Sequence, residues 1–175
     1  MIKATRDLYE AAESSMMIKK YVISRDANVY QAWPDVTLTH SGKLVCVFSE
    51  CTHHVNRDYT RIMLTTSEDR GRSWSTKRPL TEGTGGKEYF YNCARISTLA
   101  DGRLVVLVDK IGRAQGEDAV DTTSIIMFFS KDEGETWSAP ILTPAKGIVP
   151  DKLCVLDNGR WIISCHSKLE GYLTQ

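Results

Sequence analysis

The sequence predicts an all-β protein of the β-propeller class, and two repeated patterns support this prediction. The octapeptide SEDRGRSW at 67–74 returns as SKDEGETW at 130–137. A second pattern, two apolar runs joined by a polar turn that ends in glycine, occurs at 36–50, 96–110 and 152–166. Units of about sixty residues that each hold four short strands are typical of propeller blades, which pack face to face around an axis.

Each unit is predicted to begin with a β-hairpin. The turn is Ser-Gly in the first unit, Asp-Gly in the second and Asn-Gly in the third, with the glycines at Gly42, Gly102 and Gly159. Glycine tolerates the positive φ that such tight turns need, so these dipeptides between apolar runs indicate hairpins. Each turn would join the innermost strand of a blade to its second strand.

A third and a fourth strand complete the predicted unit. The apolar runs RIMLTTS at 61–67 and SIIMFFS at 124–130 each lead into an octapeptide, and a short strand is expected after its tryptophan. The predicted units cover residues 30–80, 90–145 and 148–175, and the third is incomplete.

The octapeptides are predicted to be structural turns. An aspartate in each can accept hydrogen bonds from backbone N–H groups, a glycine permits a left-handed backbone, and a tryptophan can bury its ring between neighbouring sheets. The residues of the shared pattern are Ser67, Asp69, Gly71, Trp74, Ser130, Asp132, Gly134 and Trp137.

Composition narrows the class of protein. Of 175 residues, 42% are hydrophobic, as in a globular chain, and 22 basic residues balance 22 acidic ones. There is no basic surplus for nucleic acid and no apolar run near the ~20 residues of a membrane span, so neither partner is expected. The N-terminal segment lacks the apolar core of a signal peptide, and a cytoplasmic location is expected for the chain as written.

The five cysteines are expected to be buried free thiols. Their number is odd, no Cys-x-x-Cys occurs, and most lie in apolar runs. A zinc site would need clustered cysteines and histidines, and Cys51 with His53 and His54 comes nearest to this. No metal or organic cofactor is expected.

The pattern Ser-x-Asp-x-Gly-x-Ser/Thr-Trp resembles the Asp-box, or bacterial neuraminidase (BNR) repeat, of the sialidase (neuraminidase) superfamily. The resemblance covers residues 18–175 and implies a β-propeller of sialidase type, six-bladed when complete. The chain would be an N-terminal fragment with about two and a half four-stranded blades after a leader at 1–17. Alternatively, self-association of copies would cover the open blade edges. Other propellers also carry Asp-boxes, so the resemblance points to fold more than to activity.

Strand alternation predicts which face of the propeller carries the chemistry. The loops between second and third strands, at 49–60, at 108–123 and from 166 on, share a face with the starts of the innermost strands. Carboxylates, arginines, histidines and aromatic residues gather there, whereas the opposite face holds the glycine turns and the octapeptides. Loops are generally polar and often functional, so this pattern favours a site on the first face.

Within these loops, the resemblance assigns Asp58 to general acid–base catalysis, because sialidase-like enzymes carry such an aspartate in this loop of the first blade. The alternative is a loop aspartate that pairs with Arg57 or caps a turn. Glu50, at the end of the second strand, is a competing carboxylate. His54 is a second candidate for proton transfer, as in some sialidase-like lyases and glycosidases, with a merely hydrogen-bonding surface histidine as the alternative.

Arginines are the candidate substrate-binding residues, because a guanidinium group binds a carboxylate in a two-pronged contact. Arg95, near the start of an innermost strand, is the main candidate for binding a substrate carboxylate, and a salt bridge between blades is the alternative role. Arg57 and Arg113, in the loops, are further candidate substrate-binding residues. The sialidase pattern Arg-Ile-Pro is replaced by Trp-Pro-Asp at 33–35. Asp35 would bind sugar hydroxyls or cap the strand, and the missing arginine implies a substrate other than sialic acid.

The resulting expectation is a sialidase-like exo-glycosidase that hydrolyses terminal sugars, sialic acid among them, from glycans. The tyrosine nucleophile of sialidases and its glutamate partner come from later blades, and no residue here matches them. One alternative is a non-catalytic propeller that binds glycans or proteins. Another is a sialidase-fold glycosidase or polysaccharide lyase that uses His54 on a non-sialic substrate.

Overall fold

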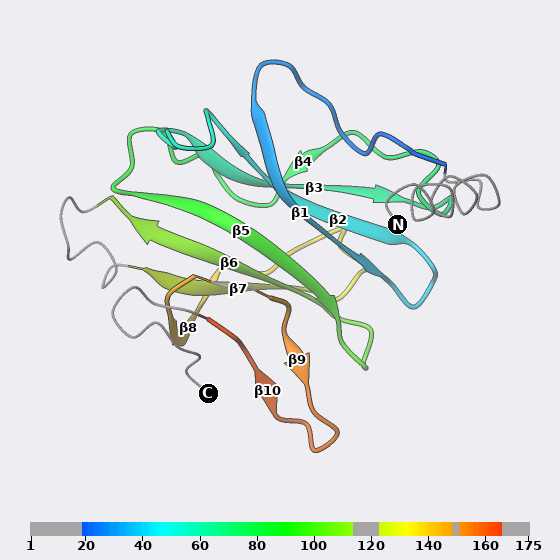
Figure 1. Ribbon diagram of the computed structural model, residues 1–175. Helices are drawn as coiled ribbons and strands as arrows, with labels where there is room; N and C mark the ends of the chain where they lie inside the picture. The colour runs from blue at the N-terminus through cyan, green and yellow to red at the C-terminus, as the bar shows by residue number, and fades with distance from the viewer. Residues whose placement is uncertain (1–18, 114–122, 149–150, 166–175) are drawn as a thin grey trace, which may run out of the picture.

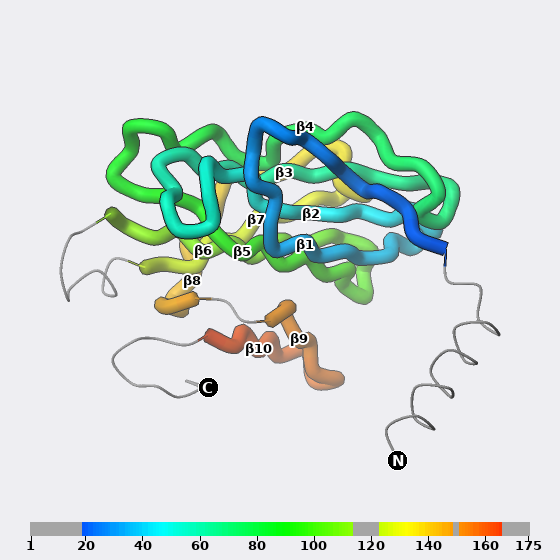
Figure 2. Tube along the Cα trace, turned by 45° about the horizontal axis from the view of Figure 1, so that its top comes forward, coloured from blue at the N-terminus to red at the C-terminus, as the bar shows by residue number. Residues whose placement is uncertain are grey.

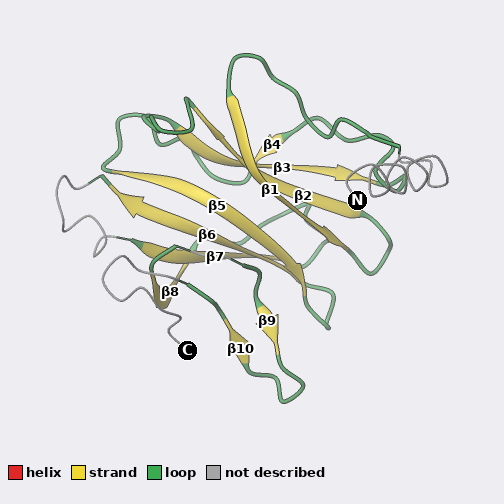
Figure 3. Ribbon diagram, viewed as in Figure 1, coloured by secondary structure: helices red, strands yellow, loops and turns green. Residues whose placement is uncertain are grey.

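The computed structural model describes residues 19–113, 123–148 and 151–165, and all regular secondary structure in these segments is β-strand (Figure 1, Figure 3). The strands form two four-stranded antiparallel sheets and one two-stranded hairpin. The predicted leader at 1–17 and the end of the third predicted unit, 166–175, lie outside the described residues.

Each four-stranded sheet is a meander, in which strands that are neighbours in sequence are neighbours in the sheet. The first blade comprises β1 (Tyr30–Leu38), β2 (Leu44–Cys51), β3 (Thr60–Ser67) and β4 (Arg78–Pro79). The second blade comprises β5 (Tyr89–Thr98), β6 (Leu104–Gly112), β7 (Ser124–Ser130) and β8 (Ile141–Lys146). The third unit is the hairpin of β9 (Cys154–Val155) and β10 (Trp161–Ile162). The first two sheets have the strand order of propeller blades, so the predicted four-strand order is confirmed for the first two units.

Apolar side chains hold the sheets together face to face, and the three sheets follow one another in space (Figure 2). Val47 and Ile62 of the first blade share one buried cluster with Ile96 and Val106 of the second, and each of them is fully buried. A second cluster joins the far face of the second blade to Leu153 in the third unit. Burial of such side chains contributes about 1.5–3 kcal/mol each, which makes these interfaces the core of the fold.

A β-bulge occupies the same position in the innermost strand of both complete blades. The pairing of β1 with β2 shifts register between Ala32 and Asp35, and that of β5 with β6 shifts at the equivalent place. Within the bulges, Trp33 and Cys93 have φ of 50° and 39°, which is uncommon for residues other than glycine. Bulges change the direction of nearby side chains.

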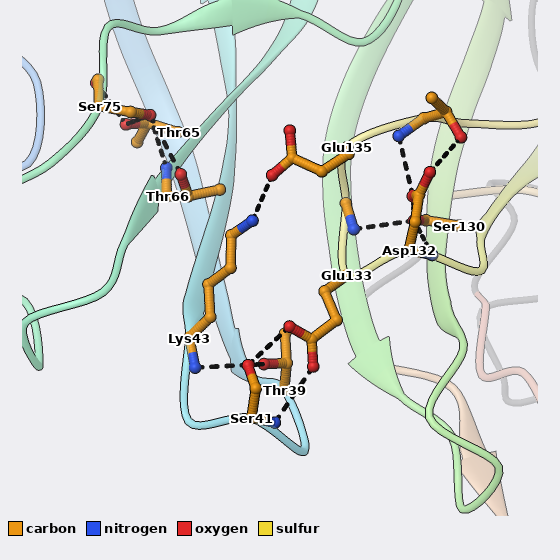
Figure 4. A network of polar contacts seen from close by, with 12 residues as sticks. Thr39, Ser41, Lys43, Thr65, Thr66, Ser75, Ser130, Asp132, Glu133 and Glu135 are labelled. Atoms are coloured by element: carbon orange, nitrogen blue, oxygen red, sulfur yellow. Dashed lines mark hydrogen bonds and ion pairs between the residues drawn. The ribbon is translucent and has the colours of Figure 1, made fainter.

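The two octapeptides form the same hydrogen-bonded turn. Asp69 accepts hydrogen bonds from Ser67 Oγ (2.9 Å), Ser73 N (2.9 Å) and Ser73 Oγ (2.6 Å), while the N–H of Gly71 donates to Ser67 Oγ (2.8 Å). Asp132 has the equivalent partners in the second blade (Figure 4). These bonds, the one from the Ser73 hydroxyl foremost, lower the pKa of Asp69 to about 2, and the equivalent bonds lower the pKa of Asp132 to about 2. Both carboxylates are therefore committed to the turn.

The octapeptide tryptophans fasten these turns to the sheets. The indole N–H of Trp74 donates to Gly71 O (3.1 Å) and that of Trp137 to Gly134 O (3.0 Å). The half-buried ring of Trp137 packs on the cluster between the blades, as predicted. The ring of Trp74 packs instead on the outer face of the first blade, against Cys46, Phe48 and Met63.

The glycine turns and the octapeptides share one face, as predicted. Ser41, in the first glycine turn, donates hydrogen bonds to Glu133 from its N–H (3.1 Å) and its hydroxyl (2.6 Å) (Figure 4). Lys43 forms an ion pair with Glu135 in the same octapeptide. The loop that joins β2 to β3 starts from the other end of these strands and therefore lies on the opposite face, with the candidate site; the predicted loops at 108–123 and from 166 on lie largely outside the described residues.

Candidate functional site

The loop between β2 and β3 is the centre of the candidate site. A hydrogen bond from Thr52 N to Tyr59 O (3.1 Å) closes its base, and one from His53 N to Asn56 O (2.9 Å) closes its tip. These backbone bonds give residues 53–58 a defined shape at the end of the first blade.

Aromatic rings and an arginine gather beside this loop in what we call the rim cluster: Tyr30, Trp33, His54, Arg57 and Phe90. The guanidinium carbon of Arg57 lies 4.5 Å from the ring centre of Trp33 and 5.6 Å from that of Phe90. Tyr30 Oη and His54 Nδ1 are 3.2 Å apart, and the ring centre of His54 is 5.6 Å from that of Tyr30 and 5.6 Å from that of Trp33. Aromatic faces with a stacked cation suit a ligand that is apolar on one face and polar at its edge.

Asp58 is exposed at the edge of this cluster. Its N–H donates to Asn56 Oδ1 (3.1 Å) and its carbonyl accepts from Arg113 Nη2 (3.0 Å). Within the part of the chain that the structure describes, its carboxylate has no hydrogen bond or ion pair, so the alternative pairing with Arg57 is not formed there.

Arg113 directs its donors at backbone carbonyls rather than into the solvent. Nε donates to Lys87 O (2.9 Å), and Nη2 donates to Arg57 O (2.7 Å) as well as to Asp58 O. The guanidinium carbon lies 5.4 Å from the ring centre of Phe90. The guanidinium groups of Arg57 and Arg113 therefore both lie near the ring of Phe90, but they donate hydrogen bonds to different carbonyls.

Glu50 lies in a buried ion network. Its side chain is 0% exposed, one oxygen binds Lys77, and the other accepts from Arg61 Nη2 (3.0 Å) and Nε (3.1 Å). Lys77 also pairs with Asp26 (2.9 Å), and Gln31 Nε2 lies 3.4 Å from Glu50 Oε1. These contacts favour a structural role for Glu50 over its predicted role in the site.

Asp35 and Arg95 occupy equivalent positions, each seven residues before its turn glycine, and Lys152 is their counterpart in the third unit. Asp35 accepts a hydrogen bond from Ile96 N (2.9 Å) and pairs with Lys152 Nζ (3.0 Å), so it links all three units. Arg95 is half-buried and donates to Ala94 O (3.1 Å). Asp35 thus connects the units through its carboxylate, and the salt bridge between blades that was the alternative for Arg95 is made by Lys152 with Asp35.

Arg57 and Arg95 both act electrostatically on the bulge of the second blade. Burial, assisted by the negative charge of Asp109, raises the pKa of the Cys93 thiol to about 11, while Arg95 and Arg57 work in the opposite direction. The charges of two candidate binding residues from different blades therefore both act on the Cys93 thiol.

Four of the five cysteines are buried and Cys154 is exposed. Cys154 departs from the prediction because its strand, β9, belongs to the two-stranded third unit, which covers little surface. Residues 19–113, 123–148 and 151–165 contain no group of three His, Cys, Asp or Glu residues arranged to hold a metal ion. The same segments contain no helix that could cross a membrane.

Comparison with solved structures identifies similar folds at low sequence identity. A Hadza microbial sialidase, Hz136, matches 77% of this chain and 32% of its own, with a TM-score of 0.60 and 18% identity. A protein of unknown function from Dyadobacter fermentans matches 82% and 49%, with a TM-score of 0.62 and 17% identity. An α-L-arabinanase from Penicillium chrysogenum, complexed with arabinobiose, matches 81% and 42%, with a TM-score of 0.50 and 18% identity.

These likenesses show the fold: the chain is all-β and forms part of a β-propeller. It spans about a third to a half of the length of the structures that it matches. No protein-family model matches the chain, and no curated protein matches it in sequence.

Proposed function

We propose that this chain forms part of a sialidase-like exo-glycosidase that hydrolyses terminal sugars from glycans, and that Asp58 is its proton donor. The observation that carries the proposal is an exposed carboxylate, without a partner among the described residues, beside the rim cluster. The similarity in fold to a sialidase and an arabinanase supports the glycosidase class. On this basis we take the octapeptide turns to be Asp-boxes.

In the proposed reaction, protonated Asp58 donates its proton to the glycosidic oxygen as the C–O bond breaks, so the leaving alcohol departs neutral. The oxygen of a water molecule finally bonds to the anomeric carbon, and a proton of this water returns to Asp58. Trp33 would contact the apolar face of the sugar, and Arg57 and Arg95 would bind its polar or anionic groups. Because Asp35 stands where sialidases carry an arginine, we propose an acidic or neutral sugar other than sialic acid. The nucleophile is not assigned to a residue of this chain.

Glycan binding without catalysis is a second candidate function, because the rim cluster can hold a sugar without any proton donor. A third reading assigns proton transfer to His54. Its Nδ1 lies 3.2 Å from the Tyr30 hydroxyl, which leaves Nε2 to face a non-sialic substrate in a glycosidase or lyase reaction.

The substitution Asp58→Asn tests the proposal, with Asp101→Asn as the matched control. Asp101 is an exposed loop aspartate at a glycine turn, on the opposite face, and pairs with Arg103 (2.7 Å). The methyl glycosides of N-acetylneuraminate, arabinofuranose and glucuronate serve as probes, because an alkoxide leaving group needs a proton. We expect Asp58→Asn to lower kcat on the hydrolysed probe about 100-fold or more, with an unchanged circular dichroism spectrum, and Asp101→Asn to keep full activity.

Three outcomes would contradict Asp58 as proton donor. Full activity of Asp58→Asn on a hydrolysed probe rejects the assignment. Loss of activity in His54→Gln together with an active Asp58→Asn favours the histidine reading. Sugar binding detected by NMR, without hydrolysis of any probe, favours the non-catalytic propeller.

A further inference from the structure

We infer that Arg113 is a positioning residue that holds the Asp58 loop of the first blade in place from the second blade. The inference rests on the proposed function in one respect, because it takes Asp58 as the group whose position matters. Arg113 itself would not touch the substrate.

The hydrogen bonds of Arg113 join three separate stretches of chain. Nη2 binds the carbonyls of two successive loop residues, Arg57 (2.7 Å) and Asp58 (3.0 Å). Nε binds the carbonyl of Lys87, in the connection between the blades, at 2.9 Å. The N–H of Arg113 donates to Glu88 O (2.8 Å), which fixes the start of the side chain. A planar guanidinium group that binds several carbonyls fixes their relative orientation better than a single flexible ammonium group would.

A shared aromatic ring strengthens this arrangement. The guanidinium groups of Arg113 and Arg57 lie 5.4 Å and 5.6 Å from the ring centre of Phe90. Phe90 pairs with Ile111 across β5 and β6, and Arg113 directly follows β6, so both the ring and Arg113 lie at one end of the second blade. The loop is thus held by hydrogen bonds and by stacking on a surface that is part of a sheet.

Apart from the stacking of Arg57 on Phe90, the remaining contacts of the loop fix its shape or join it to the first blade. The bonds from Thr52 N to Tyr59 O and from Arg57 Nε to His54 O (3.2 Å) both lie inside the loop. Among the described residues, the hydrogen bonds that join residues 53–58 to the second blade are those of Arg113. Loss of Arg113 would therefore keep the shape of the loop but remove its hydrogen bonds to the second blade, which leaves the stacking on Phe90 to hold it there.

Arg57 and Arg113 therefore differ in role, although the sequence predicts both as substrate-binding residues. Arg113 uses its donors on backbone carbonyls, whereas Arg57 donates only Nε to a described residue and keeps its terminal nitrogens for a ligand. A displacement of about 1 Å in a catalytic group can cost about 100-fold in rate, so a brace on the loop matters for chemistry even without substrate contact.

The first test measures the position of the loop without any substrate. Hydrogen–deuterium exchange of the segment 52–59 is compared in the wild type, Arg113→Lys and Arg113→Met. Arg103→Met is the matched control, because Arg103 also lies against a phenylalanine (Phe129, 5.6 Å) but on the opposite face. We expect exchange in 52–59 to rise about tenfold in Arg113→Met, less in Arg113→Lys, and not at all in the control. Unchanged exchange in both Arg113 variants overturns the inference.

The second test uses the leaving group to distinguish positioning of the acid from a general structural role. An alkoxide leaving group needs a proton, whereas the methylumbelliferyl phenolate leaves largely unaided. With methyl and 4-methylumbelliferyl glycosides of the same sugar, we expect Arg113→Lys to lower kcat about tenfold on the methyl glycoside, with KM unchanged, and much less on the other. Equal losses on both glycosides, or a change in KM alone, overturn the inference.

The two tests also keep this inference distinct from the proposed function. If no probe is hydrolysed, or Asp58→Asn is fully active, the proposed function fails and the exchange of segment 52–59 alone decides whether Arg113 holds the loop. If Arg113→Met does not fold, Arg113→Lys provides both measurements.

Discussion

Replacing Glu50 by glutamine separates a structural role of this carboxylate from a role in the candidate site. Glu50 is fully buried, whereas the side chains of its partners Lys77 and Arg61 are 23% and 34% exposed. The substitution keeps the shape of the side chain and removes its charge. The substitution leaves Lys77 and Arg61 beside a neutral amide, whose NH2 group donates hydrogen bonds and so cannot accept one from either cation.

The expected cost follows from these exposures. Removing one partner of a fully buried ion pair costs about 3–5 kcal/mol, because the other charge is left unpaired. Here the cations are partly hydrated and Lys77 keeps its pair with Asp26 (2.9 Å), so water and Asp26 offset part of the loss. We expect Glu50→Gln to lower the free energy of unfolding by about 2 kcal/mol.

Equilibrium unfolding in urea, followed by tryptophan fluorescence, measures this change. A loss of about 2 kcal/mol lowers the midpoint by about 1 M urea at a typical slope for a domain of this size. Glu82→Gln is the control, because Glu82 also pairs with a lysine, Lys87, but is 60% exposed; its midpoint should not change. An unchanged midpoint for Glu50→Gln, together with lost hydrolysis of a probe, would refute the structural reading and return Glu50 to the catalytic candidates.

Two further predictions concern the turns and the blade interface. The pKa of Asp69 and of Asp132 falls to about 2 on folding, below the usual ~3.9, so each ionised carboxylate stabilises the folded protein fully above pH 4, and this stabilisation is lost as the pH falls through 2. The urea midpoint should therefore decline less between pH 5 and pH 2 in Asp69→Asn than in the wild type. Parallel declines in the two proteins would contradict this prediction. Ile96 lies in the buried interface between the blades, and Ile96→Ala should lower the free energy of unfolding by about 3 kcal/mol. Val36, at the equivalent position of the first blade, is 41% exposed, and Val36→Ala should lower it by under ~1 kcal/mol in the same measurement. Equal losses would contradict the stacking of the blades.

Local interactions explain why the sequence predicts the strands and the octapeptide turns so well. The partners of Asp69 lie two and four residues away, and the turn at Gly42, with φ of 90°, is closed by a hydrogen bond from Gly42 N to Thr39 O (3.1 Å). Such contacts are encoded within about eight residues, and a fixed pattern of residue types reveals them. The repeat then supplies the stacking, because a second copy of a blade presents the same faces.

Contacts between distant residues explain what sequence reasoning missed. Trp33 and Phe90 belong to the rim cluster because Arg57 stacks on both, and no spacing in the chain indicates such a contact. Lys152 of the third unit pairs with Asp35 of the first. Both residues stand seven positions before a turn glycine, and this shared spacing was the one sequence signal for their contact. The different roles of Arg57 and Arg113 depend on which carbonyls lie within reach, which only the packed structure defines.

The octapeptide aspartates on one face and Asp58 on the other differ in how the fold binds their carboxylates. A carboxylate that accepts several N–H and O–H bonds is stabilised as an anion, as the lowered pKa of Asp69 and Asp132 shows, and such a group is a poor proton donor near neutral pH. The repeated aspartates therefore cannot be the acid of a glycosidase, however prominent they are in the sequence. A proton donor must come from a carboxylate whose oxygens are not already bound by the fold, and on the loop face Asp58 meets this requirement among the described residues, while Glu50 and Asp35 do not.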